Sequence, residues 1–142
     1  MVFDPRIPFV DLLGFELLHY DGGVSELAYD AQPTHLNSFE VVHGGVILTL
    51  MDVAMAVAAR SVQKDMGAVT IELKTSFMRP ATGRLLAKGQ LLHRTRNMAF
   101  TEARVLDAQG QLCAHATGTF KYMPRREPSQ GASNPGTGIA TD

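Results

Sequence analysis

The 142-residue sequence is poor in cysteine, tryptophan and net charge: it contains one cysteine and no tryptophan, and its net charge is only −1. A single cysteine, Cys113, cannot form a disulfide within the chain, which excludes a disulfide-held fold and favours a reducing compartment. It also cannot build a thiolate zinc site, and no two histidines have the spacing of helical metal ligands, so we expect no bound metal. The near-neutral charge gives no reason to expect nucleic-acid binding or electrostatic attachment to a membrane.

Long apolar runs are also missing. The longest, in residues 45–60, is interrupted by Thr49 and Asp52 and falls short of the roughly 20 residues needed to cross a bilayer. No basic segment followed by an apolar stretch opens the sequence, so we expect no secretion signal and a cytoplasmic protein.

The apolar content of 45% is sufficient for a core, and the length fits one domain. We expect that domain to occupy residues 1–122. Residues 123–142 are rich in proline, glycine and serine and show no apolar periodicity, which predicts a flexible C-terminal tail.

Residues 43–60 predict one helix that opens on two glycines and closes on Arg60, and its length from Gly45 to Arg60 is about 24 Å. It is apolar on nearly every side, which is typical of a helix that is buried all round. Asp52 is the exception, because a carboxylate in mid-helix must be paired, hydrogen-bonded or protonated if it is buried. It lies on a stripe whose other members are small: Gly45, Thr49, Ala56 and Ala59.

Alternating apolar and polar residues predict strands before and after this helix. Residues 15–20 and 24–30 form an expected hairpin around two glycines. Residues 68–79, 84–96, 98–106 and 111–122 predict four longer strands in a meandering antiparallel sheet. In the first of them, alternation places Ile71 and Phe77 on one face and Thr70 on the other. The predicted class is α+β, with an antiparallel sheet wrapped around one long central helix.

This architecture and four sequence segments together resemble the hotdog fold, and within it the thioesterases of the phenylacetate-degradation (PaaI) type. The segments are Asn-Ser-Phe-Glu-Val-Val-His-Gly-Gly (37–45), Leu-Met-Asp-Val-Ala-Met (50–55), Thr-Ile-Glu-Leu-Lys-Thr-Ser-Phe-Met-Arg-Pro (70–80) and Ala-Thr-Gly-Thr-Phe (116–120). The resemblance implies an acyl-CoA thioesterase that hydrolyses an aromatic or medium-chain acyl-CoA to the free acid and coenzyme A. It implies no cofactor, since coenzyme A is part of the substrate. A hotdog hydratase or dehydratase and a non-catalytic acyl-CoA-binding module are the alternatives.

Asp52 and Gly44 are the principal catalytic candidates. Asp52 is expected to act as nucleophile or as general base on water, and the sequence does not separate these roles. The alternative is a buried carboxylate paired with an arginine or a backbone donor. Gly44 offers a peptide N–H at the positive end of the helix, which suits a developing oxyanion. Alternatively, Gly44 and Gly45 only permit a tight entry into the helix.

Three further catalytic roles come from the resemblance alone. It implies that His43 and Asn37 orient the thioester or hold the loop that forms the oxyanion site. Their alternatives are a helix-capping histidine and an asparagine that binds its own backbone. Thr70 corresponds to a hydroxyl that reaches the site from the neighbouring subunit in relatives, although threonine is also a common strand former.

The substrate-binding candidates are Gly45, whose missing side chain lets a ligand approach, and three arginines. Arg79, Arg94 and Arg96 could meet the phosphates of coenzyme A, but alternate basic residues on a strand usually form its solvated face. The resemblance places the active site between two subunits. It therefore implies a homodimer, and homotetramers built from two dimers are common among relatives.

Overall fold

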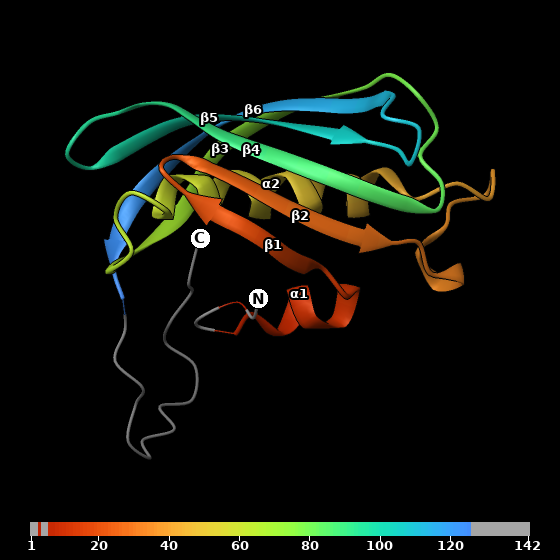
Figure 1. Cartoon of the computed structure of the whole chain (residues 1–142), viewed down its shortest axis with the longest axis horizontal. Helices are drawn as coiled ribbons and strands as arrows, with labels where there is room; N and C mark the ends of the chain where they lie inside the picture. The colour runs from red at the N-terminus through yellow and green to blue at the C-terminus, as the bar shows by residue number, and fades with distance from the viewer. Residues whose placement is uncertain (1–2, 4–5, 126–142) are drawn as a thin grey trace, which may run out of the picture.

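The computed structural model describes residue 3 and residues 6–125, which form one antiparallel sheet curved around a long helix (Figure 1). In chain order the elements are α1 (Pro8–Leu13), β1 (Glu16–Asp21), β2 (Val24–Asp30), the 3₁₀ turn η1 (Pro33–His35), α2 (Gly44–Arg60), β3 (Met66–Phe77), β4 (Arg84–Arg94), β5 (Met98–Leu106) and β6 (Leu112–Pro124). All five strand pairings are antiparallel. The predicted α+β hotdog arrangement is thus confirmed.

The predicted meander is wrong at one connection. The strand order is β1-β2-β4-β5-β6-β3, so β3 lies at an edge beside β6 instead of beside β4. Residues 78–83 cross the end of the sheet. There the Met78 amide donates to the Cys113 carbonyl at 2.8 Å, and the Ala81 carbonyl accepts the Val42 amide at 2.9 Å. Proline and glycine in this segment predicted a turn, but a connection of this length serves a hairpin or a crossover equally well.

A β-bulge at Ile71 reverses the predicted alternation in the first half of β3. The register with β6 shifts between Thr70 and Glu72, so that Ile71 is the extra residue. Ile71 is consequently 54% exposed instead of lying on the inner face. Thr70, predicted on the opposite face from Phe77, turns toward α2, where its hydroxyl meets Asp52.

Hydroxyl groups of the surrounding structure fix the middle and the C-terminal end of α2. The buried Ser25 hydroxyl donates to the Ala54 carbonyl at 2.6 Å, and the Tyr122 hydroxyl donates to the Ala59 carbonyl at 2.8 Å. Gly89 of β4 lies directly against the Ala54 carbonyl, where a side chain would collide with it. These carbonyls accept bonds beyond those of the helix itself, which holds the helix close to the sheet.

One side of α2 is open in the single chain, so the expectation of burial all round is wrong for that side. Gly45 and Leu48 are exposed, and Thr49, Asp52 and Ala56 are only half-buried. The opposite side packs against the sheet, and Leu50, Met51, Ala54 and Met55 have no exposed surface. The small stripe predicted from the sequence therefore lies mostly on the uncovered side.

The predicted strand ends shift by about two residues, as is usual for element boundaries. β3 spans Met66–Phe77 instead of 68–79, β4 stops at Arg94, and β6 continues to Pro124. The start of the predicted tail is thus part of β6. Residues 126–142 lie outside the described residues, so the flexible tail stays a prediction there.

Candidate active site at the N-terminus of α2

A buried tyrosine holds the loop that leads into α2. The Tyr29 side chain is 1% exposed, and its hydroxyl forms a 2.6 Å hydrogen bond with Nδ1 of His35. The two rings also stack, with centroids 5.7 Å apart. Burial raises the pKa of the Tyr29 phenol, so the hydroxyl keeps its proton at neutral pH. The His35 carbonyl accepts the His43 amide at 2.9 Å, which ties the loop to the start of the helix.

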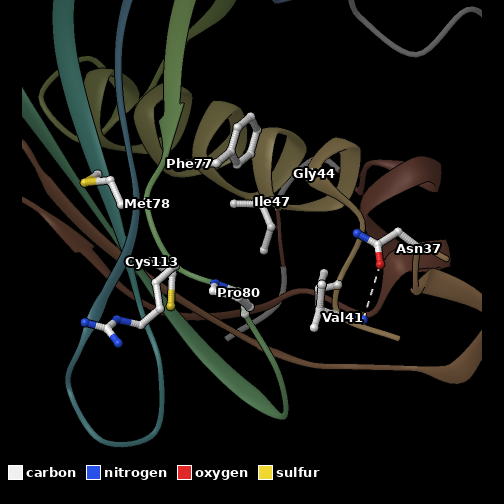
Figure 2. Close-up of a pocket in the computed structure, with 11 residues that line it drawn as sticks. Asn37, Val41, Gly44, Ile47, Phe77, Met78, Pro80 and Cys113 are labelled. Atoms are coloured by element: carbon white, nitrogen blue, oxygen red, sulfur yellow. Dashed lines mark hydrogen bonds between the residues drawn. The ribbon is translucent and has the colours of Figure 1, made fainter. Parts of the chain in front are cut away.

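Asn37 closes a tight turn within this loop. Its side-chain oxygen accepts the amides of Phe39 at 2.9 Å and Val41 at 3.4 Å. The alternative stated for Asn37, an asparagine that binds the backbone of its own loop, is therefore present, and its role toward the thioester stays a prediction. The amide nitrogen of the same side chain points toward the neighbouring cavity (Figure 2). Asn37 can thus shape the turn with one atom and donate to a ligand with the other.

His43 caps α2 by accepting the amides of Gly45 and Val46, but it does not bind the amide of Gly44. Its Nδ1 accepts the Gly45 amide at 2.8 Å, and its carbonyl accepts the Val46 amide at 2.9 Å. Because Nδ1 accepts a hydrogen bond, the neutral ring carries its proton on Nε2. The Gly44 amide has no hydrogen-bond partner among the described residues. Gly44 therefore presents an unused donor at the positive end of the helix dipole.

A cavity of ≈ 340 Å³ lies beside this amide (Figure 2). Its walls come from the Asn37 turn, the first turn of α2, the end of β3 and the crossover that follows it, and Figure 2 shows Cys113 of β6 on the side opposite Asn37. Phe77 covers Gly44, and its ring atoms lie 3.4 Å from where a Cβ on Gly44 would be. The cavity thus places two candidate donors, from Gly44 and Asn37, next to largely apolar walls.

Asp52 lies further along the same helix and is not part of the cavity wall. The Thr70 hydroxyl donates to its Oδ1 at 2.6 Å. Within the single chain, β3 runs beside α2 and brings Thr70 to Asp52 of its own chain. The role that the resemblance implies for Thr70 in the neighbouring subunit's site stays a prediction.

The two principal catalytic candidates are too far apart to share one substrate carbonyl within a chain. Asp52 comes eight residues after Gly44, which places it roughly 12 Å further along the helix axis. A reacting carbonyl needs the oxyanion donor and the base within about 3 Å of neighbouring atoms. The single chain therefore holds two half-sites: Gly44 with Asn37, and Asp52 with Thr70.

The structure separates the candidate arginines. Arg79 lies at the exposed rim of the cavity. Arg94 instead donates to the side chain of Gln63 at 2.8 Å and lies 5.5 Å over the ring of Tyr122, beyond the C-terminal end of α2. Arg96 follows β4 in the turn at the same end and lines no part of the cavity.

Other site chemistries find little support in the described residues. Burial, assisted by the charge of Asp107, raises the pKa of the Cys113 thiol, which disfavours the reactive thiolate. Within residue 3 and residues 6–125, no group of three or more histidine, cysteine or acidic side chains could hold a metal ion. In the same part of the chain, no helix is long and apolar enough to span a membrane.

Three residues of the site were not found from the sequence. Tyr29 and His35 meet across the turn after β2, and no local pattern links a strand tyrosine to a loop histidine six residues later. Cys113 is buried in β6, and its place at the cavity depends on the crossover, which the sequence did not predict. The sequence did single out Asn37, His43 and Gly44 in one loop, and also Asp52, Thr70 and Arg79.

The sequence model of the thioesterase superfamily matches residues 39–114, which is more than half of the chain. The chain belongs to the thioesterase superfamily. The matched region begins two residues after Asn37 and contains Gly44, Asp52 and Thr70, the other members of the two half-sites. The protein is therefore an enzyme that hydrolyses thioesters.

Relatives of this thioesterase cover most of its length. The medium/long-chain acyl-CoA thioesterase YigI of Escherichia coli is 28% identical, over 84% of this chain and 88% of that protein. The solved TT0310 protein of Thermus thermophilus is 30% identical, with a TM-score of 0.75 over 82% of this chain and 97% of its own. E. coli PaaI, at 22% identity, shares the fold with a TM-score of 0.79 over 84% and 87% of the two chains.

Proposed function

We propose that this thioesterase hydrolyses acyl-CoA to a free acid and coenzyme A at an active site shared by two copies of the chain. The observation that carries the proposal is the Gly44 amide, which lacks a partner among the described residues and opens toward a cavity at a helix N-terminus. The name of the YigI relative supports acyl-CoA as the substrate class.

The thioester oxygen binds between the Gly44 amide and the Asn37 side-chain amide. Both donors border the same cavity, and the helix dipole adds positive potential at Gly44. Negative charge develops on this oxygen as the carbonyl carbon becomes tetrahedral, so donors aimed at it lower the barrier. Loss of one such donor typically slows the reaction about 10²- to 10³-fold.

The second copy supplies the carboxylate. A two-fold dimer places the same patch of each chain against the other. The open stripe of α2 around Thr49 and Asp52, with the free edge of β3, is the surface that such a pair would cover. Antiparallel packing of two α2 helices brings the N-terminus of one toward the middle of the other. Asp52 of the partner subunit then faces the carbonyl held at Gly44, which removes the separation of roughly 12 Å within a chain.

In the general-base form, Asp52 takes a proton from water while the water oxygen bonds to the thioester carbon. The tetrahedral intermediate collapses, the C–S bond breaks, and the proton passes from Asp52 to the departing sulfur. In the nucleophilic form, a carboxylate oxygen bonds to the thioester carbon, the C–S bond breaks and coenzyme A leaves as the thiolate. Water then hydrolyses the resulting anhydride, which frees the acid, restores the Asp52 carboxylate and supplies the proton that the thiolate takes up. In both, the Thr70 hydroxyl orients the carboxylate through its 2.6 Å hydrogen bond. Water is the only co-reactant, so the proposed reaction requires no cofactor.

Arg79, at the cavity rim, suits a phosphate of coenzyme A. The same role for Arg94 and Arg96 stays a prediction, as does a tetramer built from two such dimers.

Release of free thiol from a panel of acyl-CoAs tests the activity, and two variants test the half-sites. Asp52→Asn keeps the shape of the side chain and an acceptor for Thr70, so kcat should fall about 10²- to 10⁴-fold while the protein stays folded. Asn37→Asp keeps the oxygen that closes the turn but removes the amide donor. It should lower kcat about 10²- to 10³-fold.

Mixing the two inactive variants tests the shared site. After co-refolding, half of the dimers are heterodimers with one intact site of two, so activity should return to about a quarter of the wild-type value. If a mixture that is shown to contain heterodimers stays inactive, the shared site is contradicted. Tight acyl-CoA binding without thiol release in the wild type would favour a binding module, and water addition to an enoyl-CoA would favour a hydratase.

A further inference from the structure

The cavity beside Gly44 has a polar end and an apolar floor. The polar end carries the Gly44 and Asn37 amides. The floor consists of Val42, Ile47, Ala81 and Cys113, each at most 4% exposed. Arg79 is the one charged residue among the described residues that line the cavity, and it lies at the exposed rim. The cavity therefore offers hydrogen-bond donors at one end and only apolar contacts below.

We propose that this cavity binds the acyl group of the thioester and that Cys113, at the end of its floor, limits the length of the acyl chain. The inference rests on the proposed function, because it takes the thioester carbonyl to lie at Gly44. The carbonyl joins the acyl group to coenzyme A, so one of the two must enter the cavity from that point.

Desolvation decides which part enters. The phosphates and the adenine ring of coenzyme A would lose their hydration against Val42, Ile47 and Ala81, with no buried partner in the described floor to replace it. An acyl chain gains free energy from the same contacts, at about 25 cal/mol per Å² of apolar surface buried. Coenzyme A is then left on the side of the exposed rim, where Arg79 lies.

Size supports the same assignment. A cavity of ≈ 340 Å³ is near the lower end of the roughly 300–1,000 Å³ range of small-molecule sites. It suits a medium acyl chain or a single aromatic ring more closely than a long chain.

Cys113 is suited to set the limit because its position is fixed. Its carbonyl accepts the amides of Met78 at 2.8 Å and Arg79 at 3.2 Å, which anchors the crossover wall to β6. The side chain is 1% exposed, and its raised pKa keeps the thiol neutral and apolar in character. A smaller or larger residue at this position therefore changes the depth of the cavity without adding charge.

Substitution at Cys113 tests the inference through acyl-chain preference. We would measure kcat/KM for acetyl-, hexanoyl- and octanoyl-CoA. Cys113→Ala should raise the octanoyl-to-acetyl ratio roughly tenfold, since one extra methylene of space in an apolar pocket typically changes kcat/KM by 10- to 200-fold. Cys113→Leu should lower hexanoyl hydrolysis by a similar factor and leave acetyl hydrolysis within about twofold. Val105→Ala is the matched control, because it opens the core without touching the cavity and should leave the ratios unchanged.

Thiol labelling provides a second measurement on the unmodified protein, and it needs neither variant to fold. Cys113 is the only cysteine, so maleimide incorporation measured by mass spectrometry reports this position alone. Hexyl-CoA thioether at ten times its Kd should slow labelling about tenfold if the chain fills the cavity. Coenzyme A and ethyl-CoA thioether at equal saturation should have less than a twofold effect.

Failure of the inference and failure of the proposed function give different results. If acyl-CoA is hydrolysed but the acyl preference ignores both Cys113 variants, or coenzyme A alone protects the thiol equally, the cavity does not hold the acyl chain. If no acyl-CoA is hydrolysed but hexyl-CoA still protects Cys113 selectively, the acyl site stands and the catalytic proposal fails.

Discussion

Tyr29→Phe tests how much the hydrogen bond between Tyr29 and His35 contributes to the position of the Asn37 turn. The substitution removes only the hydroxyl that meets His35 at 2.6 Å, and it keeps the ring that packs edge-on against Phe15 with centroids 5.6 Å apart. His35 is half-buried, so water can reach the exposed Nδ1 and the net loss should be close to the usual value of about 1 kcal/mol. In a domain of this size that corresponds to a fall in Tm of roughly 3 °C.

The effect on catalysis should be larger than the loss of stability suggests. His35 accepts the His43 amide, so movement of His35 shifts both Asn37 and the cap beside Gly44. A displacement of 1 Å in a catalytic group can cost about 10²-fold, and partial relaxation should therefore lower kcat roughly tenfold. KM should change little, because the apolar floor of the cavity is untouched. Steady-state kinetics and thermal denaturation of the same sample measure both quantities.

Tyr122→Phe is the matched control. It removes a similar buried hydroxyl, which donates to the Ala59 carbonyl at 2.8 Å at the opposite end of α2. It should cost about the same stability, near 1 kcal/mol, and leave kcat within twofold. If Tyr122→Phe lowers kcat as much as Tyr29→Phe does, the loss reflects general destabilisation. The positioning argument for Tyr29 would then be refuted.

Three further predictions concern stability. His43→Ala removes the side-chain cap of α2 and should cost about 1 kcal/mol, measured as a lower urea midpoint with an unchanged m-value. Gly89→Ala forces a methyl group against the Ala54 carbonyl and should cost roughly 3 kcal/mol or prevent folding, whereas a wild-type midpoint would show that the helix can move away. Stability should fall as the pH rises above 9.0, because the raised pKa of Cys113 keeps its proton on the folded chain while the unfolded thiol ionises. Tyr29 adds a second loss above pH 10.0, and urea titrations of wild type and Cys113→Ala between pH 8 and 11 separate the two.

Local features were predictable from the sequence, whereas features set by distant contacts were not. The bounds of β5 and the end of α2 follow from patterns within a few residues, and the structure confirms them. The spacing of Asn37, His43 and Gly44 is equally local, because all three lie in one loop and its following turn. These features need no knowledge of what packs against them.

The topology error has a clear physical origin. A connection that contains proline and glycine reverses the chain in a hairpin and in a crossover alike, and only strand pairing distinguishes them. β3 pairs with β6 along its whole length, from Met66 opposite Pro124 to Phe77 opposite Ala114. These partners are far apart in the sequence, and the pattern within either strand does not encode the choice of partner. The bulge at Ile71 is similar, since one extra residue inverts the facing of every residue before it.

The exposed side of α2 shows the same limit in another form. The residues from Gly45 to Ala56 are apolar or small enough to predict burial, yet the single chain leaves this stripe uncovered. The apolar pattern of α2 indicates that the helix is suited to burial on this side, and it does not indicate whether the same chain or another chain covers it.

The contact between Gly89 and the carbonyl of Ala54 has a consequence for how this scaffold can diversify. The Ser25 hydroxyl donates a hydrogen bond to the same oxygen, so two contacts fix the position of the helix along its axis. A shift of the helix by one residue, about 1.5 Å along its axis, would move that oxygen away from Ser25 and weaken or break this hydrogen bond. Changes in substrate specificity must therefore arise from side chains and from the connecting segments, while the position of α2 along its axis stays the same.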